Sequence, residues 1–141
     1  IRDPYVWRAP YLPALNVDSQ FVYDAEQNFD MLRFGLREWK RVAPYLLKEF
    51  YTLTPWHREQ DTADFTAFCY YDPDREDGVI LAFRQENCAG DLLEVSLPFA
   101  SGADRYTVTD EDSREESVTD RVVTLRFEAP RTAKLLWVKK I

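Results

Sequence analysis

Residues 64–84 read DFTAFCYYDPDREDGVILAFR, and this stretch predicts two strands joined by a tight turn. Its first part, Asp64–Tyr71, is rich in aromatic residues and ends at Asp72-Pro73, a pair typical of turns. Its last part, Gly78–Arg84, is a nearly continuous apolar run, as in a strand buried on both faces. The stretch therefore favours a β-hairpin in the interior of a sheet.

The register of this hairpin bears on the two cysteines of the chain. If Tyr71 and Gly78 flank the turn, Cys69 pairs with Ile80 and Cys88 lies roughly 26 Å further along, at ~3.3 Å per residue. A disulfide joins Cα atoms only ~4.4–6.8 Å apart. We therefore expect reduced thiols, with Cys69 in the core, and the thiols favour a reducing, cytoplasmic compartment.

Further short strands are expected along the rest of the chain, separated by turn residues such as Gly90, Pro98, Gly102 and Pro130. They are Leu92–Leu97, Arg105–Thr109, Val118–Phe127 and Ala133–Lys139. The acidic stretch Asp110–Glu116 is expected to be a solvated hairpin tip. Strands of this length and spacing predict a mainly β fold, an antiparallel β-sandwich of the Greek-key type, over residues 49–141.

One helix is expected before the strands, from about Asp24 to Leu47. Apolar residues recur there at spacings of three and four: Phe29, Leu32, Leu36, Trp39, Ala43 and Leu46. Asp24 suits the N-cap. Gly35 weakens the helix by about 1 kcal/mol, and Pro44 should loosen its last turn.

The first 23 residues contain Pro4, Pro10 and Pro13 among aromatic residues. Prolines this dense argue against a helix, so we expect an extended arm that packs on other surfaces. The chain opens at Ile1 without methionine or a signal-like segment, and we expect a longer parent protein.

The composition narrows the range of partners. The chain has 141 residues and a net charge of −7, which disfavours nucleic acid and anionic membrane surfaces. It contains no apolar run long enough to span a bilayer. The sequence also predicts no cofactor and no metal site, because His57 is the only histidine and phosphate-loop and calcium-loop patterns are missing.

Several motifs, taken in order, resemble the C-terminal region of family-36 glycoside hydrolases, mostly bacterial α-galactosidases. They are Asp3–Arg8 (DPYVWR), Leu36–Tyr45 (LREWKRVAPY), Phe50–Pro55 (FYTLTP), Gly78–Arg84 (GVILAFR) and Tyr106–Asp112 (YTVTDED). In that family a helix at the end of the catalytic barrel region leads into a β domain. The resemblance assigns residues 1–48 to the tail of the catalytic region and residues 49–141 to the C-terminal sandwich.

The resemblance also implies a function. The parent would hydrolyse α-galactosides by a retaining mechanism with two carboxylates, and could be a homo-oligomer. The family's catalytic motifs do not occur in this chain, so we predict no catalytic residue here and interpret its carboxylates as surface charge. The sandwich would cap and stabilise the barrel of the same protein.

The alternative is a carbohydrate-binding module that grips oligosaccharide with exposed aromatic side chains. Its candidate residues are Trp56, His57 and Trp7, each of which has a structural interpretation too. Trp56 could pack under the helix, His57 could be an ordinary loop residue, and Trp7 could be buried between domains. A third possibility is a module that docks a separate protein chain.

Trp39 and Trp137 are expected in the core, and Arg84 is expected in an ion pair.

Overall fold

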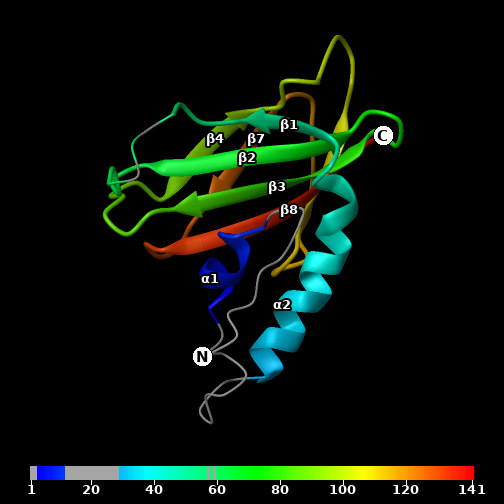
Figure 1. The fold of residues 1–141 in the computed structure, drawn as a ribbon. Helices are drawn as coiled ribbons and strands as arrows, with labels where there is room; N and C mark the ends of the chain where they lie inside the picture. Colours follow the sequence, from blue (N-terminus) through cyan, green and yellow to red (C-terminus); the bar gives the residue numbers. More distant parts are fainter. Residues whose placement is uncertain (1–2, 12–28, 57, 59) are drawn as a thin grey trace.

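The described residues form eight strands that make two antiparallel sheets packed face to face, a β-sandwich (Figure 1). The structure is a computed structural model, and it describes residues 3–11, 29–56, 58 and 60–141. The large sheet has the order β1-β2-β3-β8-β5-β6, and the small sheet pairs β4 with β7. The strands are β1 (Glu49–Thr52), β2 (Phe65–Asp72), β3 (Asp77–Arg84), β4 (Leu92–Ser96), β5 (Tyr106–Asp110), β6 (Glu116–Thr119), β7 (Val122–Arg126) and β8 (Thr132–Lys140). The mainly β sandwich expected from the sequence is confirmed.

The central hairpin has the predicted register. Tyr71 pairs with Gly78 and Cys69 pairs with Ile80. Both cysteines are free and buried. Burial raises the pKa of the Cys69 thiol to about 12, because an apolar surrounding disfavours the thiolate.

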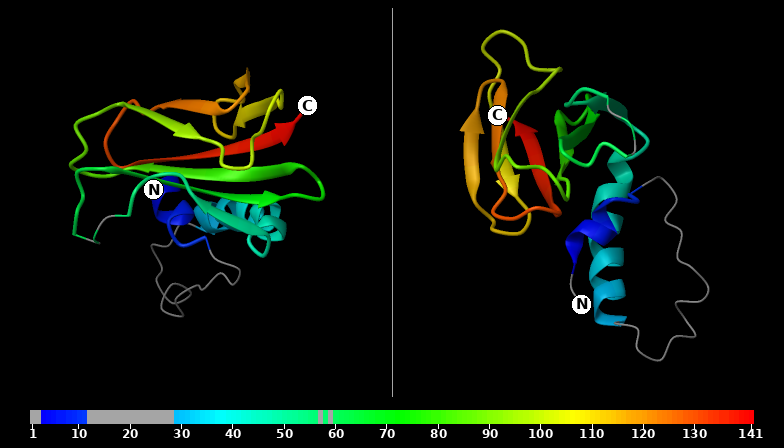
Figure 2. Two further views of the ribbon diagram at one scale, coloured as in Figure 1. Left: turned by 90° about the horizontal axis from the view of Figure 1, so that it is seen from above. Right: turned by 90° about the vertical axis from the view of Figure 1, so that its left-hand side faces the viewer.

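The large sheet is covered on both faces, which explains the unbroken apolar run in β3. Figure 2 shows three layers: the small sheet, the large sheet, and the helices. Ile80 and Ala82 contribute to the core between the two sheets, while Val79, Leu81 and Phe83 contribute to the core under the helices. Because successive side chains of a strand point to opposite faces, a central strand covered on both sides needs apolar residues at every position.

Helix α2 (Phe29–Val42) continues into a 3₁₀ turn, η2 (Ala43–Tyr45), which contains Pro44. The loosened last turn predicted from Pro44 is therefore confirmed. Four residues of α2 are buried: Met31, Gly35, Glu38 and Val42. Asp24, the predicted N-cap, lies outside the described residues. No helix in the described part of the chain has the length and apolarity to cross a membrane.

The prediction of a helix-free arm is wrong. Residues Pro4–Arg8 form a short helix, α1. Pro4 occupies a first-turn position, where a missing N–H costs nothing and the fixed φ suits the helix. The Asp3 carboxylate caps α1 by accepting the Tyr5 N–H at 3.1 Å. Proline at the start of a helix is favourable, so counting prolines misled the prediction.

The strands differ from expectation in two ways. The single strand predicted over Val118–Phe127 is two strands, β6 and β7, which belong to different sheets. The chain changes sheets at Asp120 and Arg121. Edge strand β1 was not predicted, because its residues are mostly exposed and give no apolar alternation.

Candidate functional site

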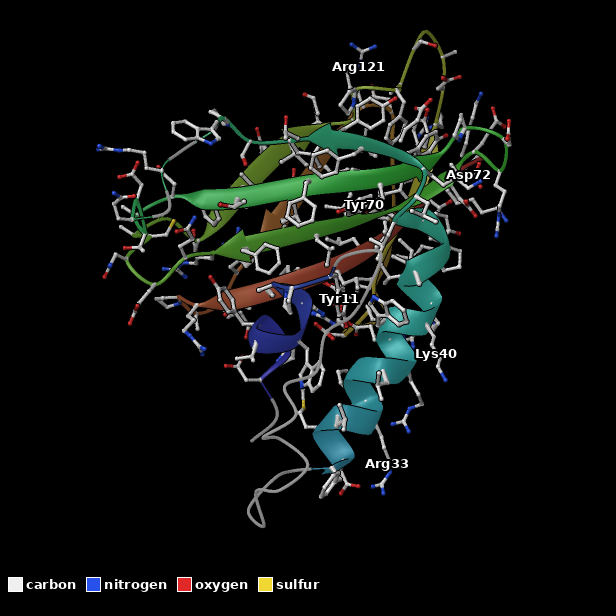
Figure 3. All side chains as sticks on the ribbon, in the orientation of Figure 1. Tyr11, Arg33, Lys40, Tyr70, Asp72 and Arg121 are labelled. Atoms are coloured by element: carbon white, nitrogen blue, oxygen red, sulfur yellow. The ribbon has the colours of Figure 1, made fainter. Side chains whose placement is uncertain are left out.

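A row of aromatic side chains crosses the outer face of the large sheet beside the helices. It runs from Phe50 on β1 through Phe68 on β2 and Phe83 on β3 to Tyr5 on α1, and we call it the aromatic row. The ring centroids of successive members are 5.8, 5.9 and 5.5 Å apart. Tyr70, next to Phe68 on the same face of β2, contacts both Phe50 and Phe68; its position on that face is visible in Figure 3.

The row forms because successive side chains of a strand point to opposite faces of the sheet. In β2, Ala67, Cys69 and Tyr71 belong to the core between the sheets, so Phe68 and Tyr70 face the other way. Helix α2 and the 3₁₀ turn cover part of that face through Val42, Tyr45 and Leu46. The β1 end stays open, since the side chain of Phe50 is 52% exposed.

The orientation of the rings indicates what the row can bind. Successive ring planes are inclined by 46°, 29° and 87°. Tilted and edge-on rings pack well against an irregular apolar surface. A flat sugar ring stacks best on an aromatic face that lies flat against it, and this row offers no continuous flat platform. The geometry suits a protein surface.

Two of the three predicted sugar-binding residues, Trp56 and Trp7, lie among the described residues, and their environments differ. Trp56 is 85% exposed in the segment after β1, so the interpretation that it packs under the helix is wrong. Trp7 lies against Gly35 of α2: a Cβ placed on Gly35 would lie 2.5 Å from the Trp7 ring. Trp7 is thus occupied in helix packing within this chain, and Tyr11 is similarly buried, between the large sheet and α2 (Figure 3). His57 lies outside the described residues.

A buried ionic cluster fixes the helices that border the row. Arg8 of α1 is completely buried and donates five hydrogen bonds, which uses all five guanidinium N–H groups. Two bonds go to Glu38 of α2 at 2.8 and 3.0 Å, and two go to Asp112 at 2.8 Å each. The fifth reaches the backbone carbonyl of Ala133 in β8 at 2.9 Å. We call these residues the Arg8 cluster.

Burial alone would lower the pKa of Arg8. The hydrogen bonds to Asp112 and Glu38 outweigh it and hold the pKa above its ordinary value, so Arg8 stays charged. The Tyr11 hydroxyl also donates to Glu38 at 2.9 Å, and burial together with that carboxylate raises the pKa of Tyr11. Glu38, only 3% exposed, therefore accepts three hydrogen bonds, from Arg8 and Tyr11, and both of its oxygens are engaged in holding the helices.

The acidic tip between β5 and β6 is held against the helix and β8. The tip was expected to be solvated, and Asp112 is indeed about half exposed, but its neighbours are largely covered. Glu111 accepts from both terminal nitrogens of Arg41 on α2, and from the Trp137 indole at 2.6 Å. Asp110 pairs with Lys134 at 3.1 Å. Interpreting all carboxylates as surface charge therefore misses this cluster.

These contacts outweigh burial at both carboxyls. Burial favours the neutral acid, but hydrogen bonds from Arg41 and Trp137 leave the pKa of Glu111 below its ordinary value. At Asp110, hydrogen bonds from backbone N–H groups of the turn and from Lys134 likewise outweigh burial and lower the pKa of the carboxyl. Each carboxylate is neutralised by a named donor, and among the described residues no group of three or more His, Cys, Asp or Glu could hold a metal ion.

Two other tryptophans and one arginine were assigned from the sequence. Trp39 and Trp137 are partly buried and pack against the core under the helices, as expected. Arg84, expected in an ion pair, instead donates to the backbone carbonyls of Cys88 and Phe127 at 3.0–3.2 Å. A buried strand end leaves carbonyls without strand partners, and a guanidinium satisfies several of them at once.

Comparisons with known proteins give little. No family model and no curated protein matches the sequence. Among solved structures, the fold is similar to part of a GH27 β-L-arabinopyranosidase from Geobacillus stearothermophilus, at 14% identity and a TM-score of 0.42. The match covers 74% of this chain and 25% of that enzyme. A likeness this weak does not bear on function.

Proposed function

We propose that this chain is a non-catalytic C-terminal domain of an α-galactosidase-like glycoside hydrolase. Its sandwich packs against the catalytic barrel of the same protein and stabilises it. The parent hydrolyses α-galactosides with two carboxylates that lie upstream of this chain. The proposal starts from the ordered motifs of the sequence, and the placement of those motifs in the fold supports it.

The observation that carries the proposal is the Arg8 cluster. Arg8, Glu38 and Asp112 come from three of the motifs that resemble the family, and they meet in one set of hydrogen bonds. Phe50 and Phe83 come from two further motifs and both lie in the aromatic row. The motif residues are thus engaged in holding the domain together and in forming one apolar face, which is what an accessory domain requires.

The open end of the aromatic row, at Phe50, is the proposed contact with the barrel, because Phe83 is already buried within this chain. A half-exposed phenylalanine at the open end of a continuous aromatic face is stabilised when another apolar surface covers it. The row also adjoins α1 and α2, the segments that the resemblance assigns to the tail of the barrel region. The chain would therefore leave the barrel through α1 and α2, and the sandwich that follows would pack back against the barrel next to these helices.

The test compares Phe50→Asp in the full-length protein and in the isolated chain. In the isolated chain the substitution should lower the melting temperature only slightly, through the lost ring contacts with Phe68 and Tyr70, since about half of the residue already faces solvent. In the full-length protein it should lower the melting temperature by several degrees. Leu92→Asp, at an exposed leucine on β4, is the matched control and should be silent in both. Equal effects of Phe50→Asp in both proteins would contradict the proposed contact.

A second experiment tests the absence of catalysis. The isolated chain should hydrolyse a chromogenic α-galactoside no faster than buffer, whereas the full-length protein should turn it over. Hydrolysis by the isolated chain would overturn the proposal.

Carbohydrate binding is the second candidate, and one observation favours it. Trp56 is 85% exposed, which leaves its ring accessible to a sugar. A sugar ring stacked on Trp56 should release heat in calorimetric titration with oligosaccharides, and Trp56→Ala should abolish that heat. Trp7→Phe serves as the control, because Trp7 is engaged with Gly35. No heat with the unmodified chain would exclude this candidate for the sugars tested.

A further inference from the structure

A groove opens between β6 and β7, separate from the aromatic row. It has a volume of about 670 Å³ and is lined by residues of β5, β6, β7 and β8. Its floor consists of four buried aliphatic side chains of the core between the sheets: Val108, Val123, Leu125 and Leu136. The chain changes sheets between β6 and β7, so the groove lies where the two sheets separate.

Both strands beside the groove have unpaired edges. Within the described residues β6 pairs only with β5, and β7 pairs only with β4. The Phe127 N–H donates to the Asp91 carbonyl, and the Leu97 N–H donates to the Arg121 carbonyl. These two backbone bonds fix which residues of β7 face β4. Because hydrogen-bonded pairs alternate in an antiparallel ladder, the backbone groups of Thr124 and Arg126 point away from β4.

The same reasoning applies to β6. The bond from the Asp110 N–H to the Glu115 carbonyl makes that pair hydrogen-bonded, so Glu116 and Val118 direct their backbone groups away from β5. Glu116, Thr124 and Arg126 all line the groove. The groove therefore combines an apolar floor with free backbone donors and acceptors, the combination to which an extended strand adds.

The rim of the groove is negatively charged. Glu115, Glu116 and Glu128 are exposed, and none of the three takes part in an ion pair with another described residue. The two cations of the lining each pair with an aspartate: Lys134 with Asp110, which also lines the groove, at 3.1 Å, and Arg126 with Asp91 at 3.3 Å. With a net charge of −7 on the chain, a second copy would be repelled from this rim.

We propose that the β6–β7 groove binds an extended segment of a partner protein in which apolar and basic side chains alternate. Its main chain adds to the free edge of β7, where Thr124 and Arg126 line the groove, its apolar side chains contact the floor, and its basic side chains pair with Glu115, Glu116 and Glu128. This inference does not depend on the function proposed above.

The experiment uses the whole chain and a fluorescent peptide of alternating lysine and valine, followed by anisotropy. The lysine peptide should bind, with an affinity that falls as salt is added, and a peptide of alternating glutamate and valine should not. The triple variant Glu115→Gln, Glu116→Gln, Glu128→Gln should weaken binding roughly tenfold. Its control removes three exposed acids elsewhere, through Asp64→Asn, Asp74→Asn and Glu86→Gln, and should bind like the unmodified chain.

A second pair of variants tests the strand edge. Thr124→Pro removes an N–H that faces away from β4 and should weaken binding at least fivefold, whereas Thr124→Ala should not. Equal weakening by the two triple variants would show unspecific attraction and overturn the proposal. Unchanged binding in Thr124→Pro would also overturn the proposal. A dimer of this chain that the lysine peptide disrupts, detected by light scattering, would overturn it too.

Discussion

Arg8 and Asp112 are 104 positions apart in the sequence and share two hydrogen bonds of 2.8 Å each. The contact joins the first helix of the chain to the β5–β6 hairpin. The other side of the same guanidinium holds Glu38 of α2. One buried side chain therefore connects three segments, and the Arg41–Glu111 pair adds a second polar contact between α2 and the hairpin.

Removing Arg8 should destabilise the domain strongly. Arg8→Ala leaves Glu38 buried without its cation, and breaking a buried pair in this way costs about 3–5 kcal/mol. Urea unfolding monitored by tryptophan fluorescence measures the loss. Arg33→Ala is the matched control, because its pair with Asp30 is exposed and contributes less than about 1 kcal/mol. Equal midpoints for the two variants would contradict a structural role of the Arg8 cluster.

Gly35→Ala should destabilise the chain, although helix propensity favours alanine by about 1 kcal/mol. The new methyl group would lie 2.5 Å from the Trp7 ring, and overpacking of this kind costs about 1–3 kcal/mol. The double variant Gly35→Ala, Trp7→Ala should be more stable than Trp7→Ala alone. A double-mutant cycle of unfolding free energies measures this coupling, and additive effects would show that the two residues do not touch.

Stability should fall in acid through Glu111 and Asp110. Both carboxyls have a folded pKa below the ordinary values of 4.5 and 3.8, so the unfolded chain binds protons more tightly than the folded chain. Their contribution is complete above those ordinary values and is lost as pH falls through the folded pKa. Unfolding free energies between pH 7 and pH 3 should show this loss. Glu111→Gln should be less stable at neutral pH and should show a shallower fall.

Cys69 should resist alkylation in the native state. Its thiol is fully buried and has a pKa of about 12, so the reactive thiolate forms only when the core opens. In a Cys88→Ala background, labelling by iodoacetamide at pH 8 should follow unfolding, and urea should accelerate it. Rapid labelling at zero urea would place Cys69 at an accessible site. Cys69→Ser should cost about 1–3 kcal/mol by burying a hydroxyl group.

The sequence by itself determined the sheet interior and one helix. The apolar run Gly78–Arg84 and the turn after Tyr71 fixed the register of the central hairpin, because side-chain period and turn position are local properties. The spacing of apolar residues predicted a helix that contains α2, although the buried residues of α2 are Met31, Gly35, Glu38 and Val42, and Pro44 predicted its altered last turn. Helix α1 could have been found as well, from Asp3 as N-cap and Pro4 in the first turn.

Only the tertiary structure decided which distant residues meet. Nothing local to Arg8, Glu38 or Asp112 indicates that they share one buried cluster, since ion pairing depends on three-dimensional position. Likewise, the spacing of Phe50, Phe68 and Phe83 shows which face each side chain takes, but the aromatic row exists only because β1, β2 and β3 lie side by side. The break between β6 and β7, which belong to different sheets, was also not predicted, because residues 118–127 have the composition of a single strand.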